Sequence, residues 1–224
     1  MIQPIDSLTV GDDNVCVSES ARNIGVIFDS HVSMESHINQ VSRLCYFQLR
    51  NLSSLRPFLD TQSLEKVVHC FISTRLDYCN SLFVGLPDKL LYKLQKIQNA
   101  AARILTGSRK RDHITPVLKK LHWLPVCFRV QYKCLVMVFK CIHSLAHAYL
   151  CDLINVHRPS RTLRSADNQC DLVVPFSRSA MANERAFSIA GPRLWNALPD
   201  YLKCHTVLDD FKQDLKTFLF CLAF

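Results

Sequence analysis

Apolar residues recur at helical spacing over most of the chain, and this periodicity limits the possible fold more than any other feature. They follow i, i+3, i+4 steps from residue 33 to residue 52, and the same pattern returns in segments 60–84, 88–106, 126–150 and 206–220. Only five glycines and nine prolines occur among 224 residues, so few positions interrupt a helix. The sequence therefore predicts a mainly α-helical protein.

Capping residues and periodicity define where these helices begin and end. Ser33 is predicted as the N-cap of the first helix, and Gly107 as the C-terminal glycine of the third, Asp88–Thr106. The second helix is expected to run from residue 60 or 61 as far as Gly85, with its core stripe passing through Phe71. A long helix is predicted over residues 126–150. The last helix is predicted to follow a capping box at residues 206–209.

The residues outside these helices predict a few short strands. Ser7–Val10 and Asn14–Val17 flank a Gly-Asp-Asp-Asn sequence that favours a hairpin turn, and a third extended run follows at Asn23–Phe28. Periodicity fades over residues 155–198, an irregular basic segment with Arg158, Arg161, Arg164 and Arg178, where short strands are expected near residues 172–175 and 186–189. The predicted fold is thus a small N-terminal β-hairpin or sheet, a helical bundle, and a C-terminal helical region with short strands.

The net charge of +8 is distributed unevenly. Residues 1–100 contain nine Lys and Arg against ten Asp and Glu, whereas residues 101–224 contain eighteen against nine. A basic half indicates nucleic acid or another anionic surface, although many proteins of high pI bind neither. The alternative for such residues is a solvated outer face. The basic residues that we predict to contact phosphates are Arg103, Arg109, Lys110, Arg111, Arg129, Lys133 and Lys140.

The sequence contains no pattern typical of secretion or membrane insertion. No charged region followed by an apolar run opens the chain, and the most apolar segment, residues 134–150, is interrupted by one lysine and two histidines. We expect an intracellular protein without a membrane partner, and the sequence does not distinguish nucleus from cytoplasm. The eleven cysteines are expected to be reduced thiols in helix faces, with Cys127, Cys134 and Cys141 on the buried stripe of the long helix.

Several features suggest catalysis, but each has a simpler structural explanation. Asp12 and Asp13 lie in a predicted turn without the further carboxylate that two-metal chemistry needs. His143 and His147 have i, i+4 spacing but no accompanying ligand motif. Asp77, within the sequence STRLDYCNSL, has no second acid or histidine beside it and is predicted to make a polar packing contact. No nucleophile elbow or phosphate-binding glycine loop is present. We therefore expect no enzymatic activity, metal or cofactor.

Six phrases, taken in order and with their spacing, resemble the C-terminal part of reverse transcriptases from non-LTR retrotransposons of the jockey-like and chicken-repeat-like kind. Individually they are weak, but jointly they are specific, and the resemblance that their order and spacing carry covers nearly the whole chain, from about residue 7 to residue 220. The phrases are ARNIGVIFDSHVSMESHI (21–38), RLDYCNSLFVGLP (75–87), LQKIQNAAARIL (94–105), LHWLPVCFRVQYK (121–133), GPRLWNALP (191–199) and FKQDLKTFLF (211–220).

The resemblance implies a place within a larger polymerase. Residues 1–32 would be the primer-grip-like end of the palm, residues 33–112 a thumb-like bundle, and residues 113–224 the C-terminal region. The residues similar to the primer grip are Asn23, Ile24, Gly25 and Val26. In that family the catalytic aspartates lie upstream of the matching region, so Asp12 and Asp13 do not inherit their role.

The partners implied are the backbones of RNA or DNA, bound with low specificity, and palm and fingers domains supplied in trans. Met1 together with the missing polymerase core suggests a truncated copy of such an element. The alternative is a domesticated or orphan helical module that binds protein and has no enzymatic activity.

Overall fold

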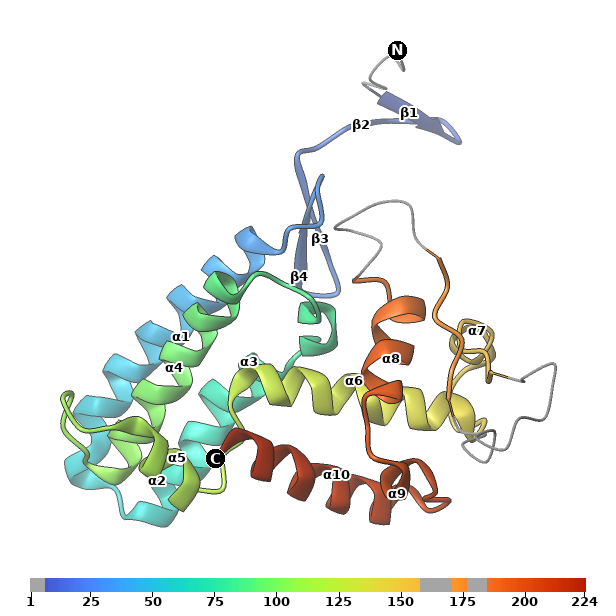
Figure 1. Cartoon of the computed structure of the whole chain (residues 1–224). Helices are drawn as coiled ribbons and strands as arrows, with labels where there is room; N and C mark the ends of the chain where they lie inside the picture. Colours follow the sequence, from blue (N-terminus) through green and yellow to red (C-terminus); the bar gives the residue numbers. More distant parts are fainter. Residues whose placement is uncertain (1–6, 158–170, 177–184) are drawn as a thin grey trace.

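A computed structural model describes residues 7–157, 171–176 and 185–224 (Figure 1). The chain is mainly helical with a small β region at its N-terminal end, as the sequence predicts, and this region consists of two antiparallel hairpins. The elements in chain order are β1 Ser7–Val10, β2 Asp13–Cys16, β3 Ser20–Asn23, β4 Val26–Asp29, α1 Glu35–Leu55, the 3₁₀ turn η1 Arg56–Phe58, α2 Thr61–Val68, the π turn η2 His69–Ser73, α3 Thr74–Asp77, the 3₁₀ turn η3 Asn80–Phe83, α4 Asp88–Thr106, α5 Ile114–Lys120, α6 Val126–Ile142, α7 Ala148–Cys151, α8 Phe187–Asn196, α9 Asp200–Lys203 and α10 Leu208–Ala223.

The two hairpins are separate two-stranded sheets. β1 pairs with β2 as the turn sequence predicts, with Val10 opposite Asp13. The run Asn23–Phe28, predicted as one strand, is instead divided between β3 and β4, because Ile24 and Gly25 both have positive φ and form the turn. Asp29 ends β4, and its carboxylate accepts hydrogen bonds from the backbone of residues 31, 33 and 34. The N-cap of α1 is Met34, which has a left-handed conformation, and not the predicted Ser33, which lies one residue earlier.

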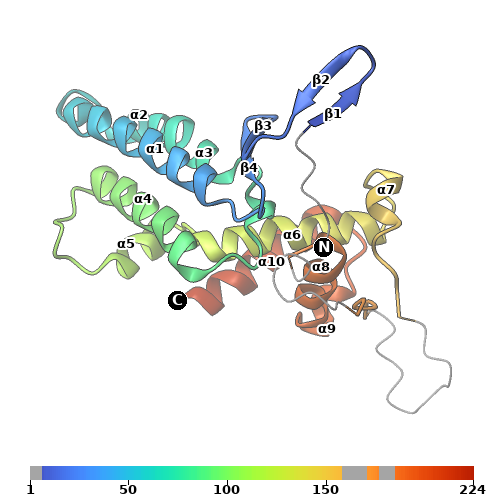
Figure 2. The same ribbon diagram turned by 90° about the horizontal axis from the view of Figure 1, so that it is seen from above.

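Helices α1 and α4 lie side by side and parallel (Figure 2). At one end Lys93 of α4 donates to Asn39 and pairs with Glu35 of α1, and at the other end Arg56 lies against Gly107. The α4 bounds and the left-handed Gly107 agree with prediction. The buried stripes of both helices, with residues of α2, α5 and the start of α6, form the first core, whose largest fully buried members are Phe83, Met34, Ile38, Leu52, Ile72, Leu94 and Ile97.

The segment predicted as one helix from residue 60 to Gly85 is broken into α2, η2, α3 and η3. The π turn η2 carries an extra residue, which rotates the face that follows it. Phe71 is therefore 43 % exposed, contrary to its predicted place in the core, while Ile72 is buried. Helix α3 ends at Asp77, and Cys79 adopts a left-handed conformation at the start of η3.

Helix α6 crosses from the first core to a second one and is shorter than predicted. It ends at Ile142, because Ser144 adopts a left-handed conformation and the Leu145 N–H bonds back to the Lys140 carbonyl, a Schellman cap. His143 and His147 therefore do not share a helix. Of the predicted thiol stripe, Cys134 and Cys141 are buried but Cys127 is exposed.

The second core lies where α6, α8 and α10 meet, and stacked aromatic rings form its centre. Phe139 of α6 stacks on Phe211 of α10 with 4.4 Å between centroids, and Trp195 of α8 lies 5.8 Å from Phe211. Leu215 and Leu219 complete the predicted buried face of α10.

Three local predictions for the C-terminal region are wrong. Residues 186–189, predicted as a strand, form the start of α8, where burial of Ile189 in tertiary packing outweighs local strand preference. The strand expected near Leu172 is a single bridge to Val156, and Asn196 hydrogen-bonds both backbone groups of Leu172. The predicted capping box makes no side-chain cap, and Val207 is the N-cap of α10. Arg158, Arg161, Arg164 and Arg178 lie outside the described residues.

Candidate nucleic-acid interface

The loop between α4 and α5 carries the densest group of the predicted phosphate-binding residues. Arg109, Lys110 and Arg111 are exposed there, and no carboxylate among the described residues forms an ion pair with them. Asp112 instead accepts from the Arg109 backbone N–H, and its own carbonyl accepts from Arg103. The loop is thus held by local hydrogen bonds while three cationic side chains extend from it.

A further cation in this region, Arg56, was missed by sequence reasoning. A Cβ on Gly107 would overlap the Nη2 atom of Arg56, so the glycine leaves room for the guanidinium. Both Arg56 and Arg103 lie at helix C-terminal ends, where cations also complement the macrodipole. No local sequence pattern predicts this proximity, because it depends on the parallel packing of α1 and α4. We call Arg56, Arg103, Arg109, Lys110 and Arg111 the basic loop cluster.

The other three predicted residues lie on α6, which extends away from the basic loop cluster (Figure 1). Arg129, Lys133 and Lys140 point within about 40° of one another at 100° per residue. Arg129 is engaged: its Nε and Nη2 groups donate to the two carboxylate oxygens of Asp77. The predicted polar packing contact of Asp77 is confirmed, and Asn80 adds a hydrogen bond to the same carboxylate. Of the three, Lys133 is exposed, while Arg129 and Lys140 are half-buried.

The four primer-grip-like residues form the tip of the second hairpin. Asn23 pairs with Val26 across the turn, Val26 is buried, and Ile24 is 80 % exposed. The Tyr78 hydroxyl donates to the Ile24 carbonyl, which fixes the tip on the end of α3. Because this hairpin leads into the N-terminal end of α1, the length of α1, about 30 Å, separates it from the basic loop cluster.

An exposed stripe on α1 combines aromatic and basic side chains. Tyr46 is 46 % and Phe47 57 % exposed, and Arg43 and Arg50 flank them on the same side of the helix. Aromatic faces between cations suit stacking on unpaired bases. A helical wheel of α1 would have found this stripe, since these four positions fall outside the apolar face.

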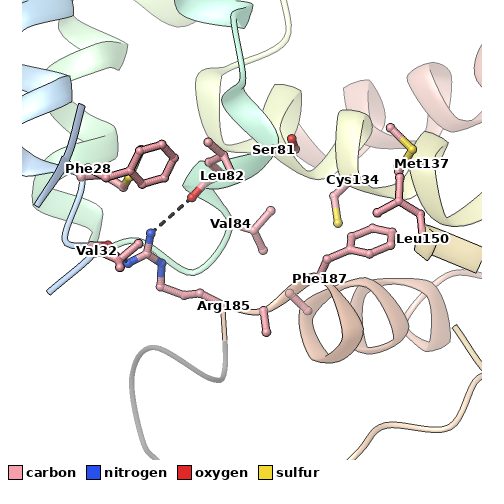
Figure 3. A pocket seen from close by; sticks show the side chains of 13 residues that line it. Phe28, Val32, Ser81, Leu82, Val84, Cys134, Met137, Leu150, Arg185 and Phe187 are labelled. Carbon is pink, nitrogen blue, oxygen red and sulfur yellow. Dashed lines mark hydrogen bonds between the residues drawn. The ribbon is translucent and has the colours of Figure 1, made fainter. Parts of the chain in front are cut away.

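An apolar cavity of about 460 Å³ lies between β4, η3, α6 and α8 (Figure 3). Phe28, Val84 and Phe187 line it, and Arg185 closes one side by donating to the Val32 and Leu82 carbonyls. Burial lowers the pKa of Arg185, and the charge of Asp29 acts in the opposite direction. Arg185 thereby links the hairpin region to α8, which is a structural role.

The described residues contain no group of three or more His, Cys, Asp or Glu side chains placed to hold a metal ion. Asp12 and Asp13 are exposed at the β1–β2 turn. In the described parts of the chain, no helix is both long and apolar enough to cross a membrane. Comparison with known protein families, curated proteins and solved structures finds no match to this chain.

Proposed function

We propose that the chain is a nucleic-acid-binding region derived from the reverse transcriptase of a non-LTR retrotransposon, without polymerase activity of its own. It binds the backbone of RNA or DNA with low sequence specificity. The observation that carries the proposal is the basic loop cluster, in which three exposed cations lack acidic partners within the described structure. Such side chains gain binding free energy by releasing counterions from phosphates.

The arrangement of the other candidate residues supports contact with an extended ligand. The basic loop cluster and the exposed stripe of Arg43, Tyr46, Phe47 and Arg50 both belong to the α1–α4 pair, so one strand can contact cations and aromatic faces in succession. Little base readout is expected, because backbone contacts carry no sequence information. The resemblance to thumb and C-terminal polymerase regions supports the same type of binding.

The test is binding to an RNA–DNA hybrid duplex across a range of salt concentrations. We expect log affinity to fall linearly with log salt, and changing Arg109, Lys110 and Arg111 together to alanine to reduce the slope by about 2–3, since each phosphate contact contributes about 0.9. A charge-matched control changes the exposed Lys66, Lys89 and Lys96 to alanine. Equal slopes for the two triple variants, or binding independent of salt, would contradict the proposal.

Exposed apolar side chains favour a second candidate, a helical module that binds protein. Phe58 is 83 % and Ile24 80 % exposed, and the resemblance assigns Ile24 to the primer-grip-like end of the palm and Phe58 to the thumb-like bundle. Light scattering and binding of a hydrophobic dye test this candidate. A strict monomer that binds no dye would exclude it.

A further inference from the structure

A second, polar cleft of about 350 Å³ lies where the two cores meet. It is bounded by the π turn η2, the connection from α5 to α6, one face of α6, and α10. We propose that this cleft binds a terminal phosphate monoester, either of a free nucleotide or of the end of a nucleic-acid strand. The ionisable side chains that line it, besides Tyr132, are His69, Asp77, His122, Arg129, Lys133 and Lys216.

The charge of the cleft favours an anion. Its one carboxylate, Asp77, is neutralised by two N–H groups of Arg129 and accepts a further hydrogen bond from Asn80. Lys133 and Lys216 are exposed and make no ion pair with any described residue. Two ammonium groups therefore line one small space without a free counter-charge. This arrangement suits a phosphate monoester, which carries up to two negative charges shared among its terminal oxygens.

Helix packing brings the two lysines to one place although 83 positions separate them in the chain. Helix α10 runs antiparallel to α6: Phe211 near its start stacks on Phe139 near the end of α6. At the other end Phe220 lies 5.6 Å from His122, just before α6 begins. Lys133 and Lys216 lie between these two contacts, and both line the cleft.

Two departures from regular helix place histidines at the cleft. His69 begins the π turn η2, and its Nδ1 atom lies 3.0 Å from the Ser73 hydroxyl. His122 is the left-handed residue of a Schellman cap on α5, a position that glycine usually fills. Both features are more frequent at functional sites than elsewhere. Here they place two imidazoles in the wall, and the Nε2 atom of His69 also lies 3.7 Å from a carboxylate oxygen of Glu65.

The cleft also has an apolar wall, which strengthens its field. Trp123 is only 6 % exposed and its ring lies 5.5 Å from that of His69, while Leu124 is buried beside it. Low-dielectric walls focus the field of the lysines into the cleft. A volume of about 350 Å³ suits a phosphate with its sugar and is too small for a duplex.

The inference goes beyond the backbone contacts proposed above, because the cleft holds one phosphate and is separate from the basic loop cluster. Titration calorimetry of the full chain with adenosine monophosphate and with adenosine tests it directly. We expect the phosphorylated ligand to bind and adenosine not to bind. Changing Lys133 and Lys216 together to glutamine is expected to weaken binding at least about tenfold.

The matched control is Lys212→Gln, one turn earlier on α10, whose ammonium group pairs with Asp209 outside the cleft. Thermal unfolding followed by circular dichroism verifies that both lysine variants are folded. Equal affinities in the double variant and the control, or equal binding of adenosine and its monophosphate, would overturn the assignment.

Two further ligands identify the source of the phosphate. Tighter binding of a 5′-phosphorylated oligonucleotide than of its 5′-hydroxyl form would support a strand end as the natural ligand. Binding of the mononucleotide without that difference would support a free nucleotide. The alanine triple variant of the basic loop cluster should lose duplex affinity while keeping the mononucleotide, so failure of one proposal is distinguishable from failure of the other.

Discussion

Gly191 controls how closely α8 approaches α6, and replacing it with alanine tests the packing of the second core. An ideal Cβ at this position would lie 2.9 Å from Cγ2 of Val138 and 3.4 Å from a ring carbon of Phe187. Carbon atoms in ordinary contact lie about 3.5–4.0 Å apart, so the two helices would have to separate by at least about 0.6 Å. The methyl group therefore overpacks the interface.

Two effects of opposite sign set the magnitude for Gly191→Ala. Overpacking a core costs about 1–3 kcal/mol, whereas alanine in place of glycine inside a helix contributes about 1 kcal/mol of stability. We expect a net loss of about 1 kcal/mol in the free energy of unfolding. In a Val138→Ala background the opposing methyl groups are gone, and the same substitution should stabilise the protein by about 1 kcal/mol.

The assay is urea unfolding of the four proteins of this double-mutant cycle, followed by circular dichroism. The expected coupling between the two positions is about 2 kcal/mol, well above the limit for independent sites. If Gly191→Ala changes the free energy of unfolding equally in the native and the Val138→Ala backgrounds, the close approach of α8 to α6 is refuted. It would also remove the structural explanation for glycine in the GPRLWNALP phrase.

Two further predictions follow from ionisable groups. Burial raises the pKa of the Cys134 thiol to about 12, whereas Cys70 is exposed. At pH 8 a thiol reagent should therefore modify Cys70 and leave Cys134 unmodified, as measured by mass spectrometry. Early labelling of Cys134 would contradict its burial. Burial, with a contribution from the charge of Arg22, lowers the pKa of His37, whose Nδ1 accepts the Ile27 N–H. The folded state thus binds fewer protons than the unfolded state, so melting temperature should fall as pH drops below about 6.5. His37→Phe should reduce this fall in melting temperature. An unchanged pH profile in that variant would contradict the role given to His37.

Periodicity alone determined most of the helical part of the fold. Helix α4 and its Gly107 cap, the first hairpin and the buried face of α10 could all be predicted, because each depends on local spacing and on residues suited to turns or caps. Composition also located the positive charge in the second part of the chain, where the exposed residues 109–111 lie. These features need no knowledge of which elements are neighbours.

Tertiary packing decided the points at which prediction was wrong. The π turn that exposes Phe71 and the helical state of Ile189 follow from packing against other elements, which local preference does not contain. Helix α6 instead ends early at a local Schellman cap that the apolar periodicity did not reveal. Tertiary packing also decided the candidate sites. Sequence spacing grouped Arg129 with free phosphate contacts, but the fold pairs it with Asp77 of α3, because electrostatic pairing depends on distance in space. The antiparallel packing of α6 and α10 brings Lys133 and Lys216 to one cleft.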